Sequence, residues 1–172
     1  ITPTSIEFVD IAGLVRGASQ GEGLGNQFLG HIREVAAICM VVRCFADDNI
    51  VHVEGSIDPK RDAETVMTEL MLADLDSLER RHDAAAKRAK AGDREARELV
   101  AVSEPVLAAL REGIPARRVK LAPEKAALLP QLHLLTAKPV MYVSNVEESA
   151  AATGNALSAV VAKMAAEEGA AH

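Results

Sequence analysis

A short apolar run followed by an acid and several glycines is the feature that most restricts how this chain can fold. Residues 6–11 are rich in β-forming side chains and include Asp10, and Gly13 follows soon after. Further glycines stand at Gly17, Gly21, Gly23 and Gly25. We expect a strand over residues 6–11, then a pliable loop, then a helix over residues 22–35. This order is typical of a phosphate sensor in a nucleotide-hydrolysing switch.

Each position in such a layout has its own chemistry. Asp10, at the end of a strand, is suited to contact Mg²⁺ through water, and Gly13 lets its backbone N–H approach a γ-phosphate. Taken alone, however, Asp10-x-x-Gly13 matches by chance often, and a plain turn explains it. A dinucleotide-binding fingerprint is the other alternative, but it needs G-x-G-x-x-G directly after a strand. Phe28 occupies the place of its last glycine, counted from Gly23.

Two later apolar runs predict the strands of a parallel sheet. Residues 36–45 are apolar almost without interruption, which favours a central strand buried on both faces. Residues 139–144 predict a second buried strand. Helices are predicted over residues 123–136, where Pro130 is expected to disturb the helix, and over residues 155–168. The sequence Asn145-Val146-Glu147-Glu148 follows the second strand at once. By itself it is weak support for a nucleotide site, because a helix N-cap explains it equally well.

The middle of the chain carries the strongest helical periodicity. Apolar or small residues recur at helical spacing on both sides of a turn at residues 91–93, at Met71, Leu75, Leu78, His82, Ala85 and Ala89, and then at Ala96, Leu99, Ser103, Val106 and Leu110. Two such stripes predict an antiparallel helical hairpin of coiled-coil type, inserted at about residues 60–122. Pro105 is expected to kink the second helix or to restart it after Ser103.

The tip of this hairpin is basic in an acidic chain. Residues 80–97 hold seven basic side chains and three acidic ones, an excess of four positive charges, whereas the whole chain has a net charge of −6. The basic residues are Arg80, Arg81, Lys87, Arg88, Lys90, Arg94 and Arg97. A solvated helical face is the plainer explanation. The functional alternative is a docking arm for RNA or an acidic partner, without base reading, since no aromatic side chain is interleaved.

Composition excludes several classes of protein. The 172 residues suffice for one domain with an insertion, and no apolar run approaches the roughly 20 residues of a membrane span. The acidic balance argues against general nucleic-acid coating, and no DNA specificity is expected. Cys39 and Cys44 would point to opposite faces of one strand, so they cannot bridge each other. Free thiols and the lack of a signal peptide favour the cytoplasm.

Several segments closely resemble the YchF family, also called Obg-like ATPases, a branch of the translation-factor class of P-loop NTPases. They include Asp10-Ile-Ala-Gly-Leu14, Gly21-Glu-Gly-Leu-Gly-Asn-Gln-Phe-Leu29, Val42-Arg-Cys-Phe45, Asp48-Asn-Ile-Val-His-Val-Glu-Gly55 and Leu135-Thr-Ala-Lys-Pro-Val-Met-Tyr142. The resemblance extends over nearly the full length. It implies an α/β fold of P-loop NTPase (Rossmann-like) type, with a mostly parallel, incomplete sheet interrupted by the helical arm.

The resemblance also implies a substrate. Most GTPases of the class follow the corresponding strand with Asn-Lys-x-Asp, whose carboxylate binds guanine; here Val146 and Glu148 replace the Lys and the Asp. Similarity to the YchF pattern implies ATP, with Asn145, Val146 and Glu148 lining the base pocket and Mg²⁺ accompanying the nucleotide. Leu14 stands where Ras-like enzymes carry a water-orienting Gln, which implies slow intrinsic hydrolysis. A guanine-specific enzyme remains the alternative.

One motif of the class is missing from these residues. No G-x-x-x-x-G-K-[ST] occurs, so the chain is expected to be a central piece of a longer protein, inactive on its own. We expect a nucleotide-binding domain split between residues 1–59 and 123–172, with the arm at residues 60–122 and residues 14–27 as the switch. The resemblance implies a role at the ribosome. A non-enzymatic adaptor that binds RNA or protein through its arm is the alternative function.

Overall fold

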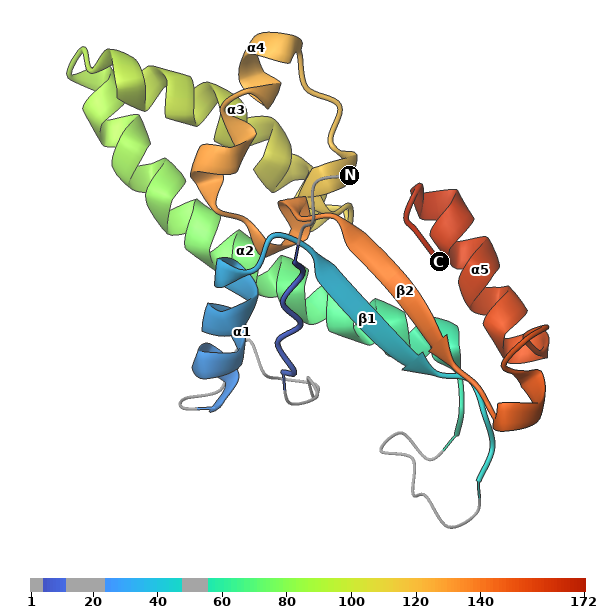
Figure 1. Ribbon diagram of the computed structural model, residues 1–172. Helices are drawn as coiled ribbons and strands as arrows, with labels where there is room; N and C mark the ends of the chain where they lie inside the picture. Colours follow the sequence, from blue (N-terminus) through green and yellow to red (C-terminus); the bar gives the residue numbers. More distant parts are fainter. Residues whose placement is uncertain (1–4, 12–23, 48–55) are drawn as a thin grey trace.

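The computed structural model describes residues 5–11, 24–47 and 56–172 of the chain. The long elements are α1 (Leu24–Glu34), β1 (Ile38–Arg43), α2 (Pro59–Lys90), α3 (Arg94–Arg111), β2 (Val140–Asn145) and α5 (Ala156–Glu168) (Figure 1). Short helical turns are η1 (Ala116–Arg118), α4 (Pro123–Ala126), η2 (Leu129–Leu132), η3 (Leu135–Ala137) and η4 (Glu148–Ala150). Among the helices of the described ranges, none combines the length and apolar character needed to cross a bilayer.

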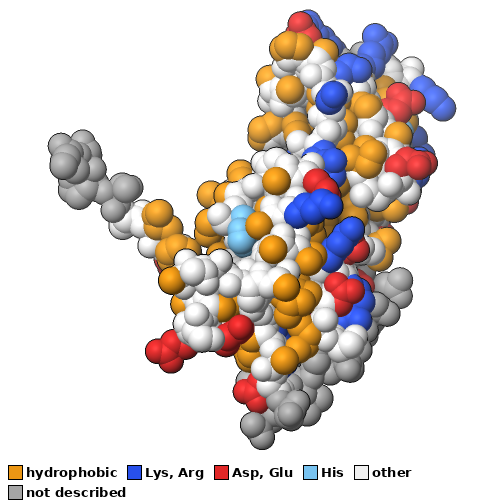
Figure 2. All heavy atoms as spheres, turned by 90° about the vertical axis from the view of Figure 1, so that its right-hand side faces the viewer, with side chains coloured by type: hydrophobic (Ala, Val, Ile, Leu, Met, Phe, Trp, Pro, Cys, Tyr) orange, Lys and Arg blue, Asp and Glu red, His pale blue; other side chains and the backbone are white. Residues whose placement is uncertain are grey.

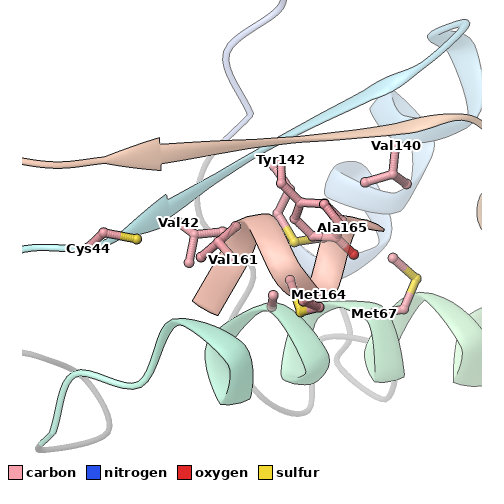
Figure 3. Packing of buried hydrophobic residues seen from close by; sticks show 10 residues of the cluster. Val42, Cys44, Met67, Val140, Tyr142, Val161, Met164 and Ala165 are labelled. Atoms are coloured by element: carbon pink, nitrogen blue, oxygen red, sulfur yellow. The ribbon is translucent and has the colours of Figure 1, made fainter. Parts of the chain in front are cut away.

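A two-stranded parallel sheet lies at the centre of the mixed α/β fold. β1 and β2 pair in register from Ile38 opposite Val140 to Arg43 opposite Asn145. Helices α2 and α5 both pack on one face of this sheet, where Tyr142 of β2 contacts side chains of both helices (Figure 3). The cluster on this face comprises Met40, Val42, Cys44, Ala63, Met67, Val140, Tyr142, Val161, Met164 and Ala165. The parallel strands predicted from the two apolar runs are therefore confirmed.

The opposite face of the sheet corrects one prediction. Burial along β1 alternates, and Val41 is 64% exposed, so this strand is buried on one face and not on both. Met141 and Val143 of β2 are exposed on the same side. Within the described residues no helix covers this face, which is why an apolar sequence typical of a central strand here has a bare side.

The predicted strand over residues 6–11 does not form in this structure. Residues 5–11 have no regular secondary structure, and the side chains of Ile6 and Phe8 are each 77% exposed. A strand needs a neighbouring strand to pair its backbone N–H and C=O groups, and residues 5–11 pair with neither strand of the sheet. The prediction of a strand over residues 6–11 is therefore wrong for this structure, although the apolar pattern is typical of one.

The predicted helical hairpin is confirmed, and we call it the arm: helix α2, the turn at residues 91–93 and helix α3 (Figure 1). Helix α2 begins after its N-cap Asp58 with Pro59 in its first turn, both favourable at a helix start. The turn holds Gly92 at φ 98°, a conformation in which a side chain is strained. Across the arm, His82 Nδ1 and Ser103 Oγ lie 2.8 Å apart, joining the two predicted stripes.

Two prolines affect the predicted helices in different ways. Helix α3 runs through Pro105 without restarting after Ser103, because Val102, Val106 and Leu107 on its neighbouring turns are buried against the arm's core. The predicted helix over residues 123–136 is broken into short turns separated by irregular backbone. Pro130 lies in the middle of this stretch and cannot donate a backbone hydrogen bond.

The segment after the arm packs back onto it. Ala116, Leu132 and Leu134 are buried in the same cluster as Leu78 of α2 and Leu110 of α3. Residues on both sides of the proposed boundary at position 122 share this cluster, so the base of the arm and the following turns are one packing unit.

Candidate nucleotide-binding site

The predicted base-binding residues lie on one turn at the carboxyl end of the sheet. Asn145 is the last residue of β2, and Glu148 begins η4, three residues on. Both side chains are exposed, and Val146 between them is half-buried against the sheet cluster. The Asn145 carbonyl accepts a 2.7 Å hydrogen bond from the backbone N–H of Cys44, just beyond β1. The turn therefore lies where ligands of open parallel sheets bind, outside the strand ends.

A residue that the sequence reasoning missed holds this turn. Asn155 is the N-cap of α5, and its Oδ1 accepts from the N–H of Ser158 at 2.9 Å. Its Nδ2 donates to the carbonyl of Cys44 at 2.7 Å and to the Glu147 carboxylate at 2.9 Å. An Asn just before an Ala-rich helix, with Ser three residues on, is a recognisable N-cap signal. No sequence pattern predicts the two hydrogen bonds that Nδ2 donates to Cys44 and Glu147.

A groove of about 480 Å³ runs between β2 and the first half of α5. Its lining includes Val146, Asn155 and His172, while Asn145 and Glu148 lie outside it. The Oγ of Ser144 and the Nε2 of His172 lie 2.9 Å apart at one side. Next to it the backbone N–H of Tyr142 donates to the carbonyl of Ala171 at 2.9 Å, so the chain's last residues line the edge of β2.

The phosphate side of the predicted site is not assembled here. Asp10 is exposed in irregular backbone, and of its segment only Ile11 packs against a core cluster. The prediction that Asp10, like Asn145, stands at the end of a strand is therefore wrong for this structure, because residues 5–11 form no strand. Among the described residues, no group of three His, Cys, Asp or Glu side chains is placed to hold a metal ion.

Most of the predicted switch falls outside the described residues. This applies to Gly13, Leu14, Gly17, Gly21 and Gly23. Gly25 is the second residue of α1, so the predicted helix after the glycine-rich loop is confirmed from Leu24 onward. Leu29 and Ile32 of this helix are buried against α2 and η3.

The thiols behave as predicted from their spacing. Cys39 is exposed on the bare face of the sheet, Cys44 is buried, and neither is in a disulfide. Burial raises the pKa of the Cys44 thiol, although a hydrogen bond to Ser144 acts against this. Arg43, at the end of β1, donates to the carbonyl of Phe45 at 3.1 Å and lies over its ring, 4.7 Å from the centroid.

A partly buried polar network lies on the face of the sheet that α2 and α5 cover. The Tyr142 hydroxyl donates to Glu168 Oε2 at 3.0 Å, and Arg117 Nη2 donates to the same oxygen at 2.7 Å. Burial, together with the neighbouring Glu168 carboxylate, raises the pKa of Tyr142 to about 12. The network joins β2, the end of α5 and η1, which are distant in sequence.

A buried carboxylate ties the arm to the segment just before β2. Asp74 of α2 accepts from the backbone N–H groups of Leu135 and Thr136, each at 2.8 Å, and from the Thr136 hydroxyl at 2.7 Å. Burial raises the pKa of Asp74, while these hydrogen bonds lower it. The Thr136 Oγ1 in turn accepts from the N–H of Ala116 at 3.1 Å.

The basic residues of the arm differ in what they contact. Arg81 donates to the Leu132 and Gln131 carbonyls, so it is part of the packed base. Four others have local partners: Arg80 with Asp76, Arg88 with Asp93, Arg94 with Glu98, and Arg97 with the Ala89 carbonyl. Lys87 and Lys90 are exposed. Lys and Arg side chains gather over the upper part of the molecule, where the arm lies (Figure 2).

Comparison with known proteins finds relatives named as ribosome-binding ATPases. No protein-family model matches the chain. The chain is 49% identical over 170 residues to the "Ribosome-binding ATPase YchF" of Bacillus subtilis, a match that covers 98% of this chain and 46% of the relative. It is 54% identical over 148 residues to the protein of the same name from Haemophilus influenzae, covering 86% of this chain and 41% of that protein.

A solved structure extends the likeness to three dimensions. The fold matches the structure of the Schizosaccharomyces pombe YchF GTPase with a TM-score of 0.71 and 34% identity, covering 86% of this chain and 41% of that one. This confirms the predicted α/β fold of P-loop NTPase type. The chain spans less than half the length of the curated relatives it matches. Over nearly all of its own length, the chain is a homologue of the YchF family.

Proposed function

We propose that this chain is the central part of a nucleotide-dependent switch ATPase of the YchF type, which binds and slowly hydrolyses ATP and acts with the ribosome in the cytoplasm. The observation that carries the proposal is the extent of its likeness to the ribosome-binding ATPase of Bacillus subtilis, 49% over 170 residues. The turn at residues 145–148 supports it, because two exposed polar side chains lie together at the carboxyl end of a parallel strand.

In this proposal, the turn at residues 145–148 binds the purine base. Asn145 and Glu148 would contact the base edge, with Val146 beside it. Glu148 is one methylene longer than the Asp of guanine-binding relatives, so its carboxylate is displaced from the position that accepts two hydrogen bonds from guanine. The absence of the Lys at position 146 removes the aliphatic stem that packs on the base. Both differences favour ATP over GTP.

The phosphates are assigned to the amino-terminal stretch. Gly13 would sense the γ-phosphate, Asp10 would contact Mg²⁺ through water, and Leu14, Gly17, Gly21, Gly23 and Gly25 would form the switch. Support for these roles is the order of residues alone. A leucine at position 14 has no polar atom to orient water, so we propose that intrinsic hydrolysis is slow and that another group activates the water.

The base assignment is tested by restoring the guanine pattern. In the full-length protein that carries this sequence, the double variant Val146→Lys, Glu148→Asp is expected to shift preference from ATP toward GTP by about tenfold or more, equal to about 1.4 kcal/mol. Competition of ATP and GTP against a fluorescent ATP analogue measures this. The exposed pair Ala151→Lys, Ala152→Asp, on the following turn, is the matched control. An unchanged ATP/GTP ratio in the double variant would contradict the base assignment.

A second candidate function is an adaptor that binds RNA or protein through the arm without hydrolysis. The exposed Lys87 and Lys90 at the end of α2 favour it, because they add positive charge close to the arm's tip. The two functions are separable. Co-sedimentation with ribosomes measures the arm's role, and ATP turnover of the same preparation measures the switch.

Charge reversal tests the arm. Lys87→Glu with Lys90→Glu is expected to weaken ribosome binding by at least tenfold at low salt and to leave ATP turnover unchanged, since both residues belong to the last turn of α2, at the end of the arm that lies away from the sheet (Figure 1). Lys120→Glu with Lys125→Glu changes the net charge equally at exposed sites outside the arm. Equal loss in both variants would mean that net charge, and not the arm, attracts the ribosome.

A further inference from the structure

We propose that Asn155 is a positioning residue that holds the turn at residues 145–148 in the geometry required for purine recognition. The inference rests on the proposed function, and it deepens it by naming what fixes the base-binding residues. All the bonds involved are in the described part of the chain, and Asn155 itself lies on the next helix, ten residues beyond Asn145.

The amide of Asn155 makes three hydrogen bonds, to the start of α5, to the end of β1 and to the turn. Its oxygen accepts from Ser158 N–H, which leaves both hydrogens of Nδ2 for acceptors. One goes to the Cys44 carbonyl at 2.7 Å and one to Glu147 Oε2 at 2.9 Å. The orientation of the amide follows from these partners, because the reversed amide would place its NH₂ against the N–H of Ser158.

These bonds close a ring around the strand ends. The N–H of Cys44 donates to the Asn145 carbonyl at 2.7 Å, and the carbonyl of Cys44 accepts from Asn155. Asn155 then reaches Glu147, which lies between the two polar residues of the turn. The end of β1, the end of β2 and the start of α5 are thus joined through one side chain. The turn at residues 145–148 is thus held at the Asn145 carbonyl by Cys44 and at the Glu147 carboxylate by Asn155.

Helix capping alone does not require this residue. An N-cap needs only a side-chain acceptor, and Ser, Thr or Asp supply one as well as Asn. The two Nδ2 bonds are additional, and only a side-chain amide combines one acceptor with two donors at this reach. The bond to the Cys44 carbonyl is partly buried, whereas Glu147 is exposed, so we assign the larger part of the positioning to Cys44.

Isosteric replacement separates positioning from capping. Asn155→Asp keeps the cap but removes both donors and sets a carboxylate against that of Glu147. Asn155→Ser keeps the cap and removes the donors without adding charge. In the full-length protein, we expect both variants to raise the Kd for ATP about tenfold and to change the ATP/GTP ratio, with kcat at saturation little altered. Asp58→Ser, an equivalent N-cap exchange on α2, is the control and is expected to bind ATP normally.

A rescue variant and hydrogen exchange complete the test. Asn155→Asp with Glu147→Gln exchanges donor and acceptor, so the amide introduced at position 147 can donate to the new carboxylate, and we expect part of the ATP affinity to return. Amide exchange of residues 145–148 is expected to accelerate in Asn155→Asp and Asn155→Ser but not in Asp58→Ser. Unchanged exchange in the first two variants would overturn the positioning role. Faster exchange with unchanged ATP affinity would instead overturn the assignment of this turn to the base.

Discussion

At the scale of single residues, Tyr142 gives the clearest prediction because it is the only tyrosine of the chain. Its side chain is 2% exposed and points from β2 toward α2 and α5 (Figure 3). The raised pKa, about 12 against 10.0 for a free tyrosine, means that the folded state keeps this proton longer than the unfolded state. Its contribution to stability is therefore complete below pH 10 and is lost as the pH rises from 10 to 12.

The size of this alkaline loss follows from the shift. A shift of two pKa units corresponds to about 2.7 kcal/mol in total, of which about 2 kcal/mol falls between pH 10 and 12, so urea denaturation is expected to show the free energy of unfolding falling by about 2 kcal/mol over this range. Tyr142→Phe is expected to cost about 1 kcal/mol at pH 7, where its hydrogen bond to Glu168 is lost. The variant should lack the tyrosine's part of the alkaline loss. A tyrosinate absorbance midpoint near pH 10 in the folded chain would contradict this picture.

At the scale of elements, η3 connects three helical segments. The Asp74 carboxylate of α2 accepts hydrogen bonds from two backbone N–H groups of η3, and the N–H of Ala116 in η1 donates to the Thr136 hydroxyl. Just after η3, Lys138 Nζ donates to the Arg33 and Val35 carbonyls at the end of α1. Leu135 is buried together with residues of α1 and α2. Helix α1, which follows the glycine-rich loop, is thereby joined to the base of the arm through the buried Leu135 and the polar contacts of η3 and Lys138.

Removing the charge of Asp74 tests this connection. Asp74→Asn places an NH₂ donor against backbone N–H donors, and we expect it to destabilise the chain by about 3 kcal/mol in urea denaturation. Asp76→Asn, on the same helix, is the matched control, because its pair with Arg80 is exposed, with side-chain exposures of 68% and 72%. We expect a change below about 0.5 kcal/mol there. Equal effects at the two positions would mean that Asp74 does not hold η3.

At the scale of the whole molecule, one face of the sheet and the stretch before the glycine-rich loop stay bare, and the sequence has no P-loop lysine motif. We expect the 172-residue chain to bind ATP weakly, with a Kd above about 100 μM, and to hydrolyse essentially none, because backbone amides and the P-loop lysine supply most of the phosphate contacts in this class. Titration of a fluorescent ATP analogue into the chain measures this. Micromolar binding accompanied by turnover would contradict it.

Much of the fold was predictable from local patterns. The stripes from Met71 to Leu110 predicted the arm, since helical spacing alone specifies which faces of two helices meet. The apolar run at residues 36–45 predicted β1 but not its bare face, because burial depends on what lies next to a strand. Pro105 was tolerated inside α3 for the same reason: packing of the flanking turns outweighs one missing backbone bond.

The candidate site, like the fold, was predictable from the sequence only in part. Sequence order by itself determined which residues follow β2, so Asn145, Val146 and Glu148 could be chosen without coordinates. Only the tertiary structure decided that residues 5–11 form no strand and that Asp10 does not meet Asn145 at a shared edge. It also decided that Asn155, Asp74 and Glu168 hold the strand ends and the arm. Hydrogen bonds of this kind join residues that are far apart in the chain, and local sequence periodicity does not predict which distant residues meet.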